Sequence, residues 1–231
     1  EQNQYKKGIP KVITFTAPFD LEETKKNITI ATNSLYKPSK EELINQAIKS
    51  HLQGNIQQAL KCYQYCLNQG YKDHRVFSNY GSILTSLGRL EEAELSTLKA
   101  IELNPDLAIA HSNLGSILKD LGKLKEAELS IRKAIKLKPH FVEAHSHLGN
   151  ILKELGKLKE AEISYRKAIE LNPDYAKAHS NLGSILRDLG KLKEAELSTR
   201  KAIELNPDYA MAHSNLGSIL SDLGKLQDAE L

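Results

Sequence analysis

The nine residues AHSNLGSIL occupy positions 110–118 and recur unchanged at 178–186 and 212–220, with the near copy AHSHLGNIL at 144–152. Successive copies of this motif lie 34 residues apart, and flanking segments such as DLGKLKEAELS and AIELNPDYA recur with them. A fixed period of this length indicates a repeat protein, in which each unit buries its apolar face only by stacking on its neighbours.

Small residues and prolines keep fixed places within the 34-residue period. The series comprise Gly81, Gly115, Gly149, Gly183 and Gly217; Gly88, Gly122, Gly156, Gly190 and Gly224; Ala93, Ala127, Ala161, Ala195 and Ala229; and Pro105, Pro139, Pro173 and Pro207. This pattern resembles the tetratricopeptide repeat (TPR) family over about residues 40–231. Its nearly identical units are also similar to the repeat-rich TPR proteins of bacteria, particularly cyanobacteria.

Each unit is predicted to contain two helices. His111, Leu114 and Leu118 fall on one helical stripe before Gly122, and a second stripe follows it. Gly122 is expected to end the first helix in the left-handed conformation, and Lys123 to begin the second. Asp106 is expected to cap the helix that follows Pro105.

Gly115 and Ala127 have almost no side chain, so we expect the two helices of a unit to cross closely there. Stacked pairs of this kind give an elongated solenoid with a concave and a convex side. The predicted fold is therefore all-α, a right-handed superhelix of antiparallel helix pairs.

The register divides the chain into a tail and a row of units. Residues 1–39 do not fit the period and are predicted to be mostly extended or disordered. The TPR superhelix is expected at 40–231, with units 40–73, 74–107, 108–141, 142–175, 176–209 and a partial unit 210–231. The first unit is degenerate, with Tyr63 and Cys66 in core places, and serves as a cap. Because the sequence starts at Glu1 and stops within a helix, we expect the native chain to be longer.

Composition excludes several functional classes. The 32 lysines and arginines against 29 acids leave a formal charge of +3, which argues against a nucleic-acid partner. The sequence has no apolar run long enough for a membrane span and no secretory signal at its start, so no membrane role is expected. Cys62 and Cys66 are interpreted as buried packing residues, and the protein is expected to be cytoplasmic.

The polar residues of the motif are predicted to face the concave groove, one step round from the packing stripe. The candidate groove residues are Asn79, Asn113, His147, Asn181 and Asn215, with Ser112, Ser116, Ser180, Ser184, Lys119, Lys153 and Arg187. A carboxamide offers one acceptor and two donors, which matches the C=O and N–H groups of an extended peptide. Helices about 8–10 Å apart would meet such a peptide about every third residue.

The asparagine series is similar to the asparagine ladder in the TPR superhelix of O-GlcNAc transferases, whose first helices carry a similar NLG motif. That resemblance implies backbone clamps at Asn79, Asn113, Asn181 and Asn215, with His147 interrupting the series. The alternative is that these asparagines are tolerated polar residues copied with each duplication. With no aromatic anchor among the groove positions, weak and sequence-tolerant binding is expected.

The sequence does not support a carboxylate clamp or a zinc site. The carboxylate clamp of chaperone-binding TPR proteins is incomplete, because Lys177 is followed by Asn181 where an arginine is needed. The recurring histidines lie one per unit, too far apart for the converging ligands of a zinc site, and are interpreted as packing residues: His111, His145, His179 and His213. No catalytic motif stands outside the repeat pattern, and no metal or cofactor is expected.

The resulting functional hypothesis is a non-catalytic interaction scaffold that binds extended peptide segments of partner proteins in its concave groove. The alternative is a substrate-recognition region of a larger enzyme, of glycosyltransferase or sulfotransferase type, with its catalytic domain beyond Leu231. Self-association through the last helix is a third hypothesis.

Overall fold

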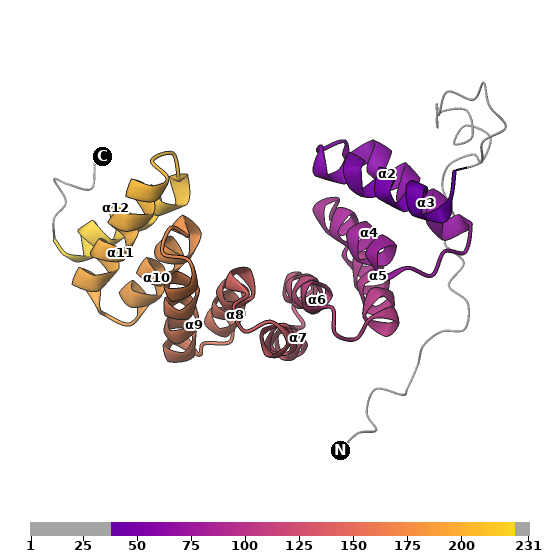
Figure 1. Cartoon of the computed structure of the whole chain (residues 1–231). Helices are drawn as coiled ribbons and strands as arrows, with labels where there is room; N and C mark the ends of the chain where they lie inside the picture. The colour runs from indigo at the N-terminus through magenta and orange to yellow at the C-terminus, as the bar shows by residue number, and fades with distance from the viewer. Residues whose placement is uncertain (1–37, 225–231) are drawn as a thin grey trace, which may run out of the picture.

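The computed structural model describes residues 38–224, and this range contains eleven α-helices arranged as consecutive pairs (Figure 1). The pairs are α2 (Lys40–Leu52) with α3 (Ile56–Asn68), α4 (His74–Ser86) with α5 (Leu90–Leu103), α6 (Ala108–Asp120) with α7 (Leu124–Leu137), α8 (Val142–Glu154) with α9 (Leu158–Leu171), and α10 (Ala176–Asp188) with α11 (Leu192–Leu205), followed by α12 (Ala210–Asp222). The predicted all-α solenoid of helix pairs is confirmed. The predictions for residues 1–37 and for the helix after Gly224 concern residues outside the described range.

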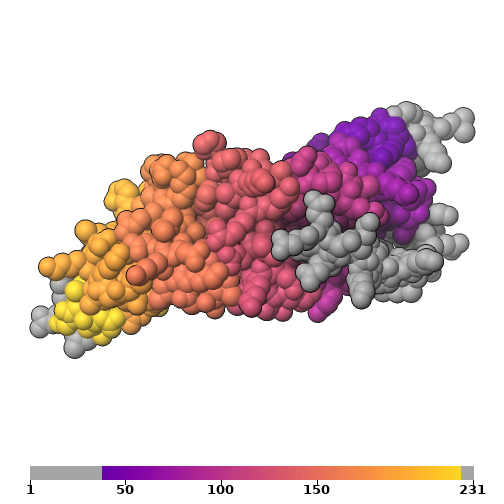
Figure 2. Space-filling view, turned by 90° about the horizontal axis from the view of Figure 1, so that it is seen from below, coloured from indigo at the N-terminus to yellow at the C-terminus, as the bar shows by residue number. Residues whose placement is uncertain are grey.

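The helix pairs stack along an arc. The first helices α4, α6, α8 and α10 each pack on the second helix of their own unit and on that of the unit before it, α2 packs on α3, and α12 packs on α11. Successive first helices also contact one another. The second helices of neighbouring units make no comparable contact within residues 38–224. The first helices, α2 to α12 in even numbers, therefore line the inner side of the arc, and the second helices form the outer side (Figure 1). Figure 2, seen from the side of α7 and α9, shows the elongated outline.

Glycine is required at the turn within each unit. Gly122 ends α6 with φ of +75°, the left-handed region in which an added Cβ is strained. Nothing lies within 4 Å of where that Cβ would stand, so the requirement comes from the backbone alone. The predicted left-handed end of the first helix is confirmed, although α7 begins at Leu124 with Lys123 as its cap residue.

The other periodic glycine is required for packing. A Cβ on Gly115 would stand 2.5 Å from Cγ1 of Ile131 and 3.2 Å from the carbonyl oxygen of Ala127. On Gly149 it would stand 2.6 Å from Cε1 of Tyr165. The predicted close crossing of the two helices is confirmed, and the second helix uses the space to bury a large side chain.

The prediction that Asp106 caps α6 is wrong. The cap residue of α6 is Leu107, and no side chain caps this helix. Asp106 instead donates its backbone N–H to Oδ1 of Asn104 at 3.2 Å, within the turn that joins the units. The helix starts later than the sequence indicates because this turn is closed by an asparagine side chain, and His111 adds a bond from Nε2 to the carbonyl of Pro105 at 2.9 Å.

The first unit shares a buried core with the unit that follows it. Tyr63 and Cys66 are fully buried, as predicted, and Cys62 is 6% exposed. Both cysteines are free thiols, and burial raises the pKa of Cys66 to about 11. A thiol with a raised pKa is a poor nucleophile, which fits a packing role. Among the described helices, none is long and apolar enough to cross a bilayer.

Candidate functional site

The candidate site is the inner face, which we define as the surface formed by the first helices α2, α4, α6, α8, α10 and α12. Contacts between side chains of successive first helices mark this face. They join Arg75 to Glu41, Ser112 to His147, Lys153 to Ser184, Asn181 to Asn150, Arg187 to Asp222 and Asn215 to Ser180. All these partners are 31 to 35 residues apart, one unit along the arc. The inner face is thus a polar surface in which side chains of each unit contact side chains of the next unit.

The serines of the SN pair lie below this surface. Ser112 is 2% exposed and Ser180 is fully buried, so neither lines the groove in the way the helical phase indicates. The following unit leans over them: Asn215 donates from Nδ2 to the Ser180 hydroxyl oxygen at 3.1 Å and lies 3.3 Å from the Ser180 carbonyl oxygen. These buried serines contact the next member of the row, His147 for Ser112 and Asn215 for Ser180, and are out of reach of a peptide. Ser116 and Ser184 are only partly buried and stay accessible on the inner face.

The asparagines are partly exposed and partly occupied. Asn181 donates from Nδ2 to Oδ1 of Asn150 at 3.1 Å, and that same oxygen accepts a bond of 2.7 Å from the hydroxyl of Tyr165. The chain of bonds runs from α9 through α8 to α10. Asn113, by contrast, makes no side-chain hydrogen bond to any described residue, so its carboxamide has all its donors and acceptors available. The members of the series therefore differ in what they offer a ligand.

His147 replaces asparagine in α8 and keeps the same reach. Its Nδ1 lies 3.4 Å from the hydroxyl of Ser112, the counterpart of the bond from Asn215 to Ser180. Burial lowers the pKa of His147, and the nearby Lys177 and Lys119 lower it further. At neutral pH the ring is uncharged, with one nitrogen that donates and one that accepts. It interrupts the asparagine series without adding a charge to the groove.

The cations at the edge of the inner face are paired with acids, mostly those of the next unit. Lys153 approaches Asp188 at 3.7 Å and donates to the hydroxyl of Ser184 at 2.8 Å. Arg187 donates to Asp222 at 2.5 Å, which lowers the pKa of that carboxyl. Lys119 lies 2.9 Å from Asp120 and 3.9 Å from Glu154. The result is a neutral, zwitterionic edge, which offers little attraction to a strongly acidic peptide.

Sequence reasoning missed two features of the inner face. Asn45, on α2, is exposed and lies one period before Asn79, so the series begins one unit earlier than predicted. Ile109, in the first turn of α6, is 52% exposed and takes the place that Arg75 has in α4, where the guanidinium reaches Glu41 on α2 at 2.7 Å. The 34-residue register could have found Asn45. The exposure of Ile109 required the structure.

The periodic histidines do not form a metal site. His145, His179 and His213 each bond through Nε2 to the carbonyl of the proline six residues earlier, as His111 does. Within residues 38–224 no three His, Cys, Asp or Glu side chains converge to hold an ion. The histidines hold the turn between units, which is a structural role.

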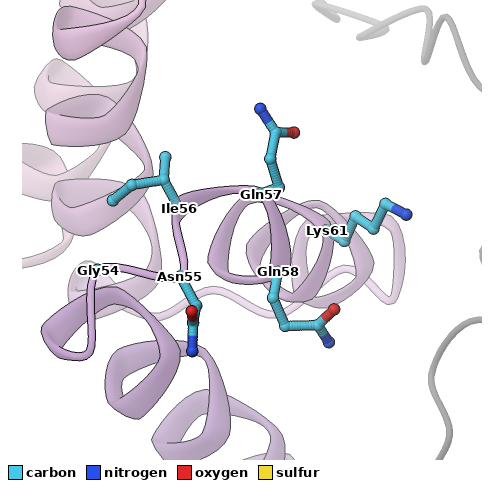
Figure 3. A pocket seen from close by; sticks show the side chains of 6 residues that line it. All are labelled: Gly54, Asn55, Ile56, Gln57, Gln58 and Lys61. Carbon is cyan, nitrogen blue, oxygen red and sulfur yellow. The ribbon is translucent and has the colours of Figure 1, made fainter.

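An open hollow of about 480 Å³ lies beside the turn between α2 and α3. It is lined by Gly54, Asn55, Ile56, Gln57, Gln58 and Lys61. Figure 3 shows that the labelled side chains of Gln57, Gln58 and Lys61 diverge from one another. Ligand sites usually bring a few polar groups together on an enclosed apolar surface, so this hollow is a poor candidate.

With this geometry established, comparison with known families identifies the class of protein. Sequence models described as "TPR repeat" match residues 81–122 and 149–186, and models described as "Tetratricopeptide repeat" match 108–141, 176–209 and 199–230. The chain belongs to the tetratricopeptide repeat family. A search of curated protein sequences finds no significant match.

Several solved structures share the fold. PilF of Pseudomonas aeruginosa is 15% identical, with a TM-score of 0.71 over 82% of this chain and 86% of its own. MamA is 22% identical, with a TM-score of 0.61 over 74% and 93%. YrrB, described as a TPR protein with an unusual peptide-binding site, is 26% identical, with a TM-score of 0.58 over 72% and 86%.

Proposed function

We propose that this protein is a non-catalytic scaffold that binds extended peptide segments of partner proteins along its inner face. The observation that carries the proposal is the row of side chains that can both donate and accept, one per unit: Asn45, Asn79, Asn113, His147, Asn181 and Asn215. Such a row presents hydrogen-bonding groups at the repeat of the helices, which suits the regular backbone of an extended chain. The peptide-binding site of YrrB supports this function in general terms.

The bonds within the inner face refine how the row binds. Asn181 and Asn215 each donate a side-chain N–H to the preceding unit. Their side-chain carbonyl oxygens then remain to accept hydrogen bonds from peptide N–H groups. Asn113 uses neither its donors nor its acceptor on any residue of the described range 38–224. Ile109, four residues before Asn113, adds an exposed aliphatic contact. We therefore place the strongest contact at α6, with a peptide that sets an apolar side chain against Ile109.

The affinity is expected to be modest. A hydrogen bond contributes about 0.5–1.5 kcal/mol net, and a few of them with one aliphatic contact give a Kd of about micromolar or weaker. The cations at the edge of the inner face are paired with acids, so they add little electrostatic attraction for an approaching peptide: Lys119, Lys153 and Arg187. Partners would therefore gain affinity by spanning several units.

The test uses an unbiased library of extended peptides and the variant Asn113→Ala. Asn113 makes no side-chain bond to other described residues, so its loss leaves the packing intact and should weaken peptide capture about five- to tenfold. Gln57→Ala, which removes an exposed carboxamide from the outer helix α3, is the matched control and should leave binding unchanged if the fold, checked by circular dichroism, is retained. Unchanged binding in Asn113→Ala, or no binding by the wild type, would make the asparagines tolerated residues of a duplicated unit.

The same inner face would serve a recognition region within a larger enzyme. Assays of the full-length protein for glycosyl or sulfuryl transfer distinguish the two functions, because a pure scaffold transfers neither group. A cytoplasmic site of action is part of the proposal, supported by the two free, buried cysteines of α3.

A further inference from the structure

The outer side of the arc carries a row of exposed aliphatic side chains, which we call the outer ridge: Leu95, Leu129, Ile163 and Leu197. One lies on each of α5, α7, α9 and α11, at the same place in each unit, and they are 38%, 60%, 68% and 71% exposed. Single exposed aliphatic residues are ordinary on protein surfaces. A row at one fixed place in four successive units is a continuous feature of the surface.

The burial of neighbouring residues at the ridge is opposite to what the hydrophobic effect favours, because the aliphatic residue is exposed and the charged residue beside it is sheltered. The residue before each ridge residue is a glutamate, and the side chains of Glu94, Glu128 and Glu162 are only 19%, 14% and 12% exposed. Each is held by a lysine of the next unit, as in Lys157 to Glu128 at 2.9 Å. A charged group therefore occupies the sheltered place between units while its aliphatic neighbour points to water. Exposing the aliphatic residue does not contribute to the stability of the solenoid.

The ridge lies in a stretch that is almost the same in the four units, with a glutamate directly before each ridge residue and a serine directly after it, while positions further along the helix vary. Three residues after the ridge residue, Leu98 stands in α5 where Arg132 stands in α7, and two residues after it Thr97 stands where Tyr165 stands in α9. The ridge position is leucine or isoleucine in these four units, whereas Lys61 occupies it in the first unit.

Lysines border the ridge. They stand four residues before and four residues after each of its last three members: Lys125 and Lys133, Lys159 and Lys167, Lys193 and Lys201. Lys167 and Lys201 pair with glutamates three residues on. The other four form no ion pair with any residue in the 38–224 range, and Lys136 adds a fifth free cation on α7. Glu91 and Glu126 beside the ridge also form no ion pair within residues 38–224, so the flanks carry a net excess of unpaired positive charge.

We propose that the outer ridge is a docking surface for an acidic amphipathic helix of a partner protein, one with aliphatic residues at heptad spacing and glutamate or aspartate beside them. The outer helices of the described range do not pack directly on one another, so successive ridge residues lie at least a packed-helix distance of about 8–10 Å apart, and seven residues of helix, which span about 10.5 Å, can bridge such a step. This places one aliphatic side chain of the partner near each ridge residue. The free lysines then meet the flanking acids, which sets the orientation of the partner.

Charge favours this occupant over two others. A second copy of the chain would set ridge lysines against ridge lysines, which repel. An anionic membrane would meet not only the lysines but also Glu160 and Glu194, which stand beside the ridge in pairs with Arg132 and Arg166. Alternating charges at fixed places suit a partner whose own charges are fixed, and the arc also curves away from a flat surface (Figure 1).

The test uses the full chain and a synthetic four-heptad helical peptide with leucine at every seventh position and glutamates beside it. The expected result is binding that weakens with salt and falls about tenfold in the variant Leu129→Ser/Ile163→Ser. Asn113→Ala is the matched control and should bind the helix as the wild type does, because the inner face is not involved. This result separates the ridge from the proposed peptide groove.

A charge reversal supplies a second readout on exposed residues that do not affect folding. Lys125→Glu/Lys159→Glu should lose the acidic peptide and gain a peptide with lysines in place of the glutamates. Three results would overturn the proposal: equal binding of both peptides by the wild type, ridge-dependent binding to phosphatidylglycerol vesicles without binding of the acidic peptide, or concentration-dependent dimers that disappear in Leu129→Ser/Ile163→Ser.

Discussion

The contact between Gly149 and Tyr165 gives the most direct test of how the helices of a unit pack. A methyl group added in Gly149→Ala would stand 2.6 Å, 2.7 Å and 2.9 Å from three atoms of the Tyr165 ring. The ring is 1% exposed, and its hydroxyl is fixed to Oδ1 of Asn150 at 2.7 Å, so it has little freedom to move. Overpacking of this kind costs about 1–3 kcal/mol.

The helix propensity of alanine works in the opposite direction. Alanine is favoured over glycine by about 1 kcal/mol within a helix, so Gly149→Ala should lower the free energy of unfolding by up to about 2 kcal/mol. In a Tyr165→Ala background the ring is gone, and the same Gly149→Ala change should raise the free energy of unfolding by about 1 kcal/mol. The sign of the effect therefore reverses with the partner residue.

Urea unfolding followed by circular dichroism measures this double-mutant cycle. Because stacked repeats unfold with coupling between neighbours, the slope of the transition must be compared with the midpoint for every variant. A loss of stability that is the same in both backgrounds would show that the close approach of the helices is not the reason for glycine at this place.

Three further predictions concern the turn, the inner face and the outer side. Gly122→Ala, with φ of +75° and open space around it, should lower the free energy of unfolding by about 1 kcal/mol, and Gly122→Asn by less; urea unfolding checks both. Burial lowers the pKa of His147 below its ordinary value of 6.5. The unfolded chain therefore binds more protons than the folded chain as the pH falls below 6.5, and the free energy of unfolding decreases over that pH range. An NMR titration should show the low pKa, and His147→Asn should be less sensitive to acid than the wild type. Glu162→Gln removes the charge that holds Lys191 and Arg166, each at 2.9 Å, and should cost about 1 kcal/mol at low salt and less at high salt in thermal unfolding.

The helices and their turns follow closely from the repeat, whereas the depth of each inner-face residue does not. Helical phase places Ser112 and Asn113 side by side, and both were expected to line the groove. The structure buries Ser112 and leaves Asn113 partly exposed, because α8 leans across the serine and sets His147 over it. The tilt of one unit on the next is a property of the stack, and no single unit's sequence records it.

The sequence rule for helix capping fails at α6, where the side chain of Asn104 closes the turn before the helix. Asp106 has the side chain of a helix cap, yet Asn104 closes the turn and α6 starts two residues later. At the start of α4, where the preceding turn differs, Asp73 does cap the helix by accepting from the N–H of Arg75 at 2.9 Å. The capping rule holds where the turn leaves the aspartate adjacent to the first helical residue.

The sequence by itself determined the period, the helix pairs, the left-handed glycine at each turn and the small residues at each crossing, because these depend on contacts within one unit and on backbone sterics. The tertiary structure decided which polar residues of the SN motif stay accessible, which cations are neutralised by the next unit and which aliphatic residues remain in water on the outer helices. These depend on how one unit covers its neighbour, since burial and ion pairing between units are set by the stacking geometry and not by the order of residues within a repeat.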